Sequence, residues 1–230
     1  MRAAILFATA LLAASPVSAQ GMRHWALGRP LFDTVFDPER NFPDLEKGGD
    51  DQMILTVQTS ARDDMAPAIS LAIAYRCITI SPTSCQPTYT ARMLRVAPEA
   101  SQFEASVAML VRLSKASNDG EARSALDASN LEWVEADVLK CDGGLDALEG
   151  VRKADWSPDL HYKLRAEPEI IMHPAMIRVT MRGDVTTSSY RGWVLAPGVP
   201  AAVRTLIATL DKCWKPSSAP KPWASGPIIR

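Results

Sequence analysis

The residues of this chain best suited to acid–base chemistry are its three histidines, His24, His161 and His173. His161 and His173 lie in a segment, residues 155–174, that also carries several acidic side chains. A histidine beside a carboxylate can act as a general acid–base pair, and two histidines with one acid can bind a metal ion. Their spacing matches neither HExxH nor another pair on one helical face, which favours a solvated polar loop.

Aromatic and polar side chains in this same segment form the leading candidate for a ligand-binding surface. The candidate binding residues are Trp156, Asp159, His161, Tyr162 and His173. Small-ligand sites combine apolar or aromatic surface with a few polar groups, and this cluster supplies both. The competing interpretation is that the aromatic rings pack in the core, where most large apolar side chains lie.

Other motifs of enzymes and cofactor sites are missing from the sequence or lie in unsuitable contexts. GxSxG and the glycine-rich nucleotide loops do not occur. Ser218 and Lys221 form a Ser-x-x-Lys pair, but prolines flank it, and no rigid helix would direct the lysine at the serine. We therefore predict no catalytic residue, no metal site and no cofactor, and we do not favour an enzyme.

The first 19 residues have the pattern of a cleavable export signal. Arg2 supplies a positive charge, an apolar run follows over residues 3–14, and Val17-Ser18-Ala19 suits a signal peptidase, so cleavage is expected after Ala19. A membrane anchor is the alternative, but the apolar run is far shorter than the ~20 residues of a spanning helix. The sequence thus predicts a periplasmic or extracellular protein without stable membrane insertion after cleavage.

Four cysteines, Cys77, Cys85, Cys141 and Cys213, are expected to form two disulfides, as is common in exported proteins. Cys77 and Cys85 bracket a turn-rich stretch between two strand-like runs. Placing them directly opposite each other brings apolar residues of both runs onto one face. This predicts Cys77–Cys85 and Cys141–Cys213 among the three possible connectivities.

The sequence is long enough for one domain with a substantial core. The net charge is −1 and there is no basic block, which argues against nucleic acid as a partner. We expect an irregular leader over residues 20–50, a single domain over 51–215 and a disordered Pro- and Ser-rich tail over 216–230.

Hydrophobic periodicity predicts the elements of that domain. Trp193 and Trp214 fall in periodic elements and are expected in the core, and a two-residue turn at Gly183-Asp184 is expected to join the last two strands. The segment over 131–139 is ambiguous and is assigned to a strand. The predicted strands cover residues 52–59, 68–80, 88–97, 131–139, 176–182 and 185–196, and the predicted helices begin near residues 101, 121, 141 and 200.

This order, β-β-β-α-α-β/α-β-β-α, predicts an α+β domain with an antiparallel sheet of about five strands, helices packed on one face and two disulfides. The favoured functional hypothesis is a non-enzymatic interaction or ligand-binding domain of the cell envelope, whose partner is an envelope protein or a small ligand. The alternative is a periplasmic hydrolase that uses His161 or His173 with a nearby carboxylate.

Overall fold

The computed structural model describes residues 31–43, 45, 52–60, 69–81, 84–97, 102–157, 175–183, 185–224 and 226–228. Within them, a seven-stranded sheet has the order β6-β5-β1-β2-β3-β4-β7, and every neighbouring pair is antiparallel. The α+β class is confirmed. The strands are β1 Gln52–Ser60, β2 Ile69–Ser81, β3 Ser84–Val96, β4 Leu131–Asp137, β5 Met176–Arg182, β6 Thr187–Trp193 and β7 Lys215–Pro216.

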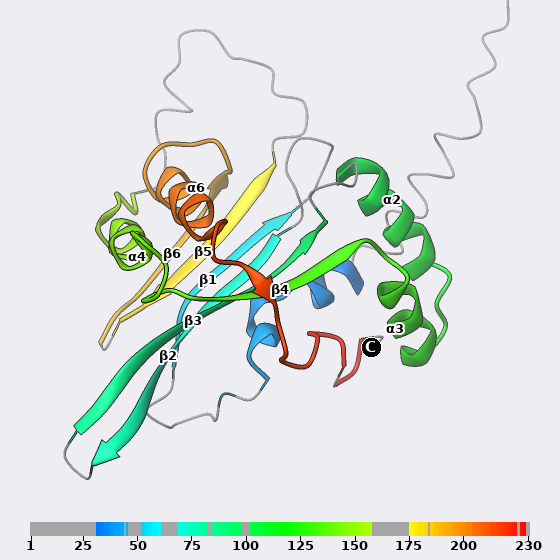
Figure 1. Ribbon diagram of the computed structural model, residues 1–230. Coiled ribbons are helices and arrows are strands. Elements are labelled where there is room, and N and C mark those ends of the chain that lie inside the picture. The colour runs from blue at the N-terminus through cyan, green and yellow to red at the C-terminus, as the bar shows by residue number, and fades with distance from the viewer. Residues whose placement is uncertain are drawn as a thin grey trace, which may run out of the picture.

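One face of the sheet forms the larger core with α4 (Gly144–Lys153) and α6 (Val199–Leu210) (Figure 1). The strands contribute buried alternate residues to it, and the two helices contribute one apolar stripe each. The disulfide between Cys141 and Cys213 connects the segments beside these helices. Side chains that form this core include Leu55, Val57, Leu71, Ile73, Met93, Val179, Leu148, Val151, Val203 and Leu206.

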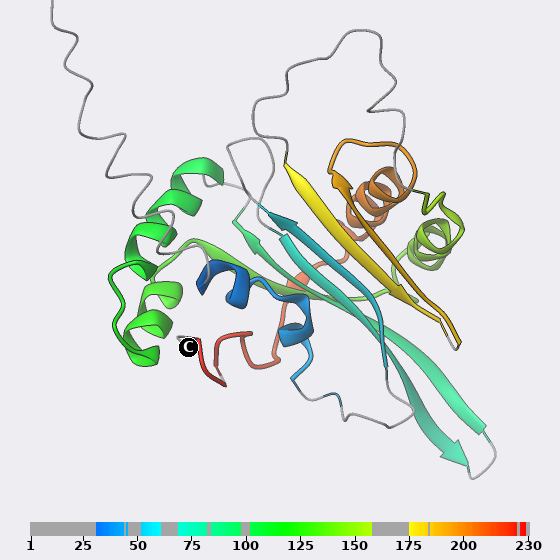
Figure 2. The ribbon, with the colours of Figure 1, turned by 180° about the vertical axis from the view of Figure 1, so that it is seen from behind.

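The opposite face of the sheet carries a second core. Leu94 and Trp133 alternate with residues of the first core and pack with α2 (Gln102–Leu113) and α3 (Asp119–Asp127). A helical turn over residues 31–35 and the 3-10 helix η1 (Pro38–Asn41) also lie on this face (Figure 2). The helices are therefore divided between the two faces of the sheet, so the prediction that they all pack on one face is wrong.

The C-terminal segment, expected to be disordered, is packed where the structure describes it. Trp223 and Ile228 are buried in the second core, and Lys221 makes an ion pair of 2.6 Å with Asp127. The Arg123 guanidinium donates to the carbonyl oxygens of Trp223 and Gly226, at 2.9 and 2.8 Å. Prolines exclude a regular helix here, but burial of Trp223 and Ile228 fixes an irregular segment, residues 217–224 and 226–228, which we call the C-terminal strap.

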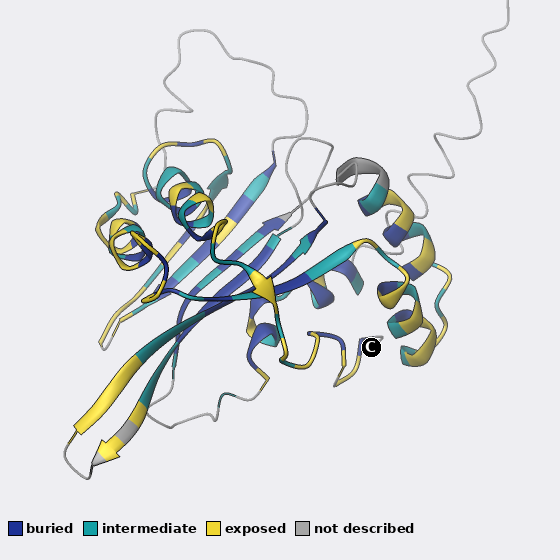
Figure 3. Ribbon diagram, in the orientation of Figure 1, coloured by how far each residue is buried: buried dark blue, intermediate teal, exposed yellow. Residues whose placement is uncertain are grey.

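The β2–β3 hairpin has the predicted disulfide but another register. Cys77 bonds to Cys85 across a Cα–Cα distance of 5.4 Å, yet its directly paired residue is Pro87. The register differs by two residues from the prediction, and a shift of two keeps every side chain on its expected face. Beyond β1 and β4 the hairpin continues as a two-stranded arm, and most of its described outer residues are exposed (Figure 3).

Candidate functional site

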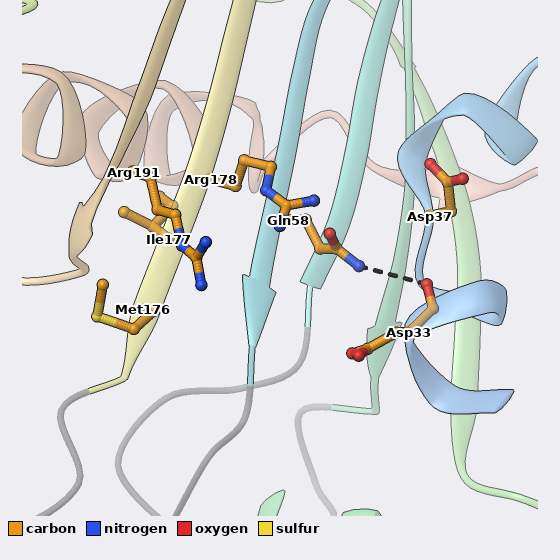
Figure 4. A pocket seen from close by; sticks show the side chains of 7 residues that line it. All are labelled: Asp33, Asp37, Gln58, Met176, Ile177, Arg178 and Arg191. Atoms are coloured by element: carbon orange, nitrogen blue, oxygen red, sulfur yellow. Dashed lines mark hydrogen bonds between the residues drawn. The ribbon is translucent and has the colours of Figure 1, made fainter. Parts of the chain in front are cut away.

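A pocket of about 220 Å³ lies between the outer strands of the sheet and the N-terminal helical segment, residues 31–41 (Figure 4). We call it the arginine pocket. It opens on the face of the sheet opposite the larger core, because Gln58, Arg178 and Arg191 alternate along their strands with buried residues of that core. The lining residues are Asp33, Asp37, Gln58, Met176, Ile177, Arg178 and Arg191.

Strand pairing places three polar side chains of the pocket in one row. Arg178 on β5 lies directly opposite Gln58 on β1 and directly opposite Arg191 on β6. Residues opposite each other in antiparallel strands point to the same face, with Cβ atoms about 4.5–5.5 Å apart. The sheet therefore holds an amide and two guanidinium groups side by side on rigid elements.

The neighbouring rows complete the surface around these arginines. On one side Met176 is paired with Trp193, and on the other Thr180 is paired with Ser189, with their hydroxyl oxygens 3.4 Å apart. Trp193 is half-buried and, by alternation, shares the face of Arg191. The periodicity of β6 was correctly recognised, but it places Trp193 beside the pocket and not in the larger core.

The other wall of the pocket is acidic. Asp33 and Asp37 come from the N-terminal helical segment, and Figure 4 shows the Asp33 carboxylate extending toward the strands. Asp37 caps η1 by accepting a hydrogen bond of 3.1 Å from the Glu39 backbone N–H. The Gln58 side-chain amide donates to the Asp33 carbonyl oxygen at 3.4 Å, which connects this wall to β1.

A buried asparagine fixes the N-terminal segment to the sheet. Asn41 has no exposed surface, and its amide donates to the carbonyl oxygens of Ser70 and Arg92 at 3.0 and 3.1 Å. Arg92 returns a hydrogen bond of 3.2 Å to the Asn41 carbonyl oxygen. At the end of the segment, Glu39 and Arg182 form an ion pair of 2.8 Å. The acidic wall is thus held at a defined position over the strands.

Arg178 and Arg191 stand out among the arginines of the sheet. Like charges directly opposite each other destabilise a strand pair. Within the described part of the chain, neither guanidinium has an ion pair or hydrogen bond to relieve this repulsion. By contrast, Arg95 pairs with Glu132 at 2.8 Å and Arg182 pairs with Glu39. An anionic group between the two guanidinium groups would remove the repulsion.

Of the residues predicted to form a binding surface, only Trp156 lies in the described part of the chain. Its ring is half-buried against the larger core, and its indole N–H donates to the Val151 carbonyl oxygen at 3.2 Å. These contacts give Trp156 a packing role. Asp159, His161, Tyr162 and His173 lie outside the described residues, and their part in a site stays a prediction.

The arginine pocket does not follow from the sequence, because the turn predicted between β5 and β6 differs from the one in the structure. A two-residue turn at Gly183-Asp184 would have placed Arg178 opposite Ser189. Instead, the last pair is Arg182 with Thr187, and the Gly183 N–H donates to the Thr186 carbonyl oxygen at 2.8 Å. The alternation along β5 and β6 indicates that Arg178 and Arg191 point away from the larger core. Only the register between the two strands places these arginines opposite each other.

Comparisons with known proteins give no relative for this chain. No protein-family model, curated protein or solved structure matches it. Among the described residues, no cluster of three or more His, Cys, Asp or Glu side chains is arranged to hold a metal ion. No described helix is long and apolar enough to cross a membrane.

Proposed function

We propose that this chain is an exported, disulfide-stabilised domain that binds a small polar ligand in the arginine pocket. The observation that carries the proposal is the pair Arg178–Arg191, two like charges directly opposite each other with no partner in the described structure. Such a repulsive pair lowers the stability of the fold, and a role in binding an anionic group explains why both arginines are present.

The architecture supports a binding role. Gln58, Arg178 and Arg191 stand on three adjacent strands, so their backbones are already ordered before a ligand arrives. A site on rigid strands loses little backbone conformational entropy on binding. The volume of about 220 Å³ is below the roughly 300–1,000 Å³ usual for ligand pockets and fits a small metabolite better than a polymer.

Export is supported by the N-terminal signal pattern and by the two disulfides, Cys77–Cys85 and Cys141–Cys213. Disulfides persist in oxidising compartments such as the periplasm or the external medium. The ligand would then be a solute of the envelope or its surroundings. The hydrolase hypothesis depends on His161 and His173, and no described residue adds support to it.

A thermal-shift screen of the mature domain against a panel of small polar metabolites tests the proposal. A ligand at about 100 times its Kd stabilises the folded state by about 2.7 kcal/mol, which raises Tm by several degrees. We expect at least one such ligand, with the shift lost in Arg178→Gln and in Arg191→Gln.

The matched control is Arg152→Gln. Arg152 is exposed on α4, which packs on the other face of the sheet, and pairs with Glu149 at 3.4 Å. The control should respond to the ligand as the unaltered protein does. A ligand that shifts Tm equally in Arg191→Gln would show that binding occurs elsewhere, and a panel without any hit would contradict the proposed function.

A further inference from the structure

The arginine wall of the pocket has the chemistry of a carboxylate site. A guanidinium presents its N–H donors in a planar fork that matches the two oxygens of a carboxylate. Arg178 and Arg191 offer two such forks from adjacent strands, and the Gln58 amide lies next to Arg178 on β1. Charge-assisted hydrogen bonds of this kind are about twice as strong as neutral ones.

The acidic wall calls for a ligand with the opposite charge at its other end. Asp33 and Asp37 line the same pocket from the N-terminal segment. A carboxylate has about four acceptor sites, so each can keep its hydrogen bonds within the protein and still accept donors from a ligand. An ammonium group, with three N–H donors and a positive charge, is the matching group.

The balance of charge in the pocket narrows the ligand further. Two arginines and two aspartates line it, so their formal charges cancel. A dianion such as a phosphate monoester would be attracted by the arginines but repelled by the aspartates. A diamine would be attracted by the aspartates but repelled by the arginines. A ligand with no net charge but two charged ends gains from both walls.

We infer that the ligand is an amino-acid-like zwitterion, with its carboxylate between Arg178 and Arg191 and its ammonium group toward Asp33 and Asp37. This inference rests on the proposed function and names the ligand class of the same pocket. Met176 gives the pocket an apolar part, on which the carbon skeleton between the two charged groups would lie, whereas the Ile177 side chain is buried in the larger core.

Derivatives that lack one charge provide the test. The proteinogenic amino acids and 4-aminobutyrate are screened by thermal shift at about 10 mM, since stabilisation grows with the ratio of ligand concentration to Kd. The best one is then titrated by calorimetry beside its N-acetyl form, which lacks the ammonium charge, and its amide form, which lacks the carboxylate. We expect Kd to rise about 10-fold or more for each derivative.

Two variants assign each charge to its wall. Arg191→Gln should raise the Kd of the zwitterion about 10- to 100-fold and that of the N-acetyl form similarly, but leave the amide form unchanged. Asp33→Asn should weaken the zwitterion and the amide form and leave the N-acetyl form unchanged. Chemical denaturation of both variants verifies that each is folded at the temperature of the titration.

The outcomes separate this inference from the proposed function. If the N-acetyl form binds as tightly as the free amino acid, or if the screen yields only an arginine-dependent ligand of another class, the zwitterion is excluded while the pocket remains a binding site. If no small polar ligand binds at all, both proposals are wrong. If Arg191→Gln weakens the zwitterion and the N-acetyl form only, and Asp33→Asn weakens the zwitterion and the amide form only, both proposals are supported.

Discussion

At the scale of single residues, Arg178 and Arg191 connect stability with function. They are directly opposite each other on β5 and β6, and both are exposed. Their repulsion is screened by solvent and salt, so it costs the fold only a fraction of a kcal/mol to about 1 kcal/mol. The same closeness lets both guanidinium groups reach one anionic group of a ligand.

The first prediction follows from this repulsion. Arg191→Gln should increase the free energy of unfolding of the ligand-free protein by about 0.2–1 kcal/mol, because it removes one of two like charges that oppose each other. Urea denaturation at low and at high salt measures the effect, and the gain should shrink as salt screens the charges. A destabilised Arg191→Gln protein would show that this arginine has a structural contact.

Residue types alone could not identify this site. The arginines look like ordinary exposed strand residues, and the more obvious Trp156 has a half-buried ring and a hydrogen bond to Val151. Arg178 and Arg191 are opposite each other because of the register between β5 and β6, which the turn after Arg182 determines. Local turn chemistry did not predict that register, because Gly183 suits several turn types.

At the scale of elements, the C-terminal strap and the N-terminal segment complete the second core. Trp223 and Ile228 from the strap pack with Phe32 and Phe36 from the N-terminal segment. The rings of Phe32 and Phe36 are stacked, with centroids 4.3 Å apart. The strap is therefore part of the folded unit, and it supports the segment that carries the acidic wall of the pocket.

Asp127 on α3 provides a pH-dependent test of the strap. Its pKa lies below its ordinary value because Lys221 donates a hydrogen bond to it, with the Trp223 indole N–H as a further donor. A lowered pKa in the folded state contributes stability above the unfolded pKa, and this contribution is lost as pH falls through the folded pKa. Both groups of the ion pair are about half exposed, so the contribution is below about 1 kcal/mol.

Asp127→Asn should accordingly lower the free energy of unfolding by less than about 1 kcal/mol at neutral pH. The difference from the unaltered protein should diminish below about pH 4 and vanish once Asp127 is protonated in the folded state. Denaturant titrations across this pH range measure it. A difference that stays constant down to acidic pH would exclude the ionised pair as its source.

The sequence predicted regular elements better than irregular ones. Strands such as β5 show an alternation that follows from burial on one face, and α6 shows one apolar stripe. The strap shows no hydrophobic periodicity, so a prediction could use only its composition. Composition cannot show that Trp223 and Ile228 pack into the second core. Such contacts depend on α2 and α3, which are distant in the sequence.

At the scale of the whole molecule, one sheet separates two cores, and each disulfide has a different task. Cys141–Cys213 spans 72 residues and connects elements of the larger core, whereas Cys77–Cys85 spans 8 residues within the projecting arm. In the chain-entropy model, a longer closed loop restricts the unfolded chain more strongly. The first disulfide should therefore dominate global stability.

Replacing Cys141 and Cys213 together by alanine should lower the free energy of unfolding by about 4 kcal/mol. Replacing Cys77 and Cys85 together should cost about 2.5 kcal/mol, since the loop is much shorter. Equilibrium denaturation of both double variants compares the two values. An equal or larger loss for the arm disulfide would contradict this division of tasks.

The α+β class and both disulfide pairs followed from the sequence because they depend on local patterns and on cysteine number. The distribution of helices over two faces did not, because Leu94 and Trp133 reveal the second core only when α2 and α3 are placed against them. The arginine pocket could not be predicted for the same reason, since it forms only when residues 31–41 pack against strands that are distant in the sequence.

The central claim is that Arg178 and Arg191 bind the ligand together. NMR of the arginine side-chain Nε–H groups, recorded while a ligand from the screen is titrated, tests this most directly. The account predicts that the Arg178 and Arg191 signals shift together and saturate at the Kd found by calorimetry, while the Arg152 signal on the far side of the sheet does not move. A saturating ligand that leaves both signals unchanged would contradict it.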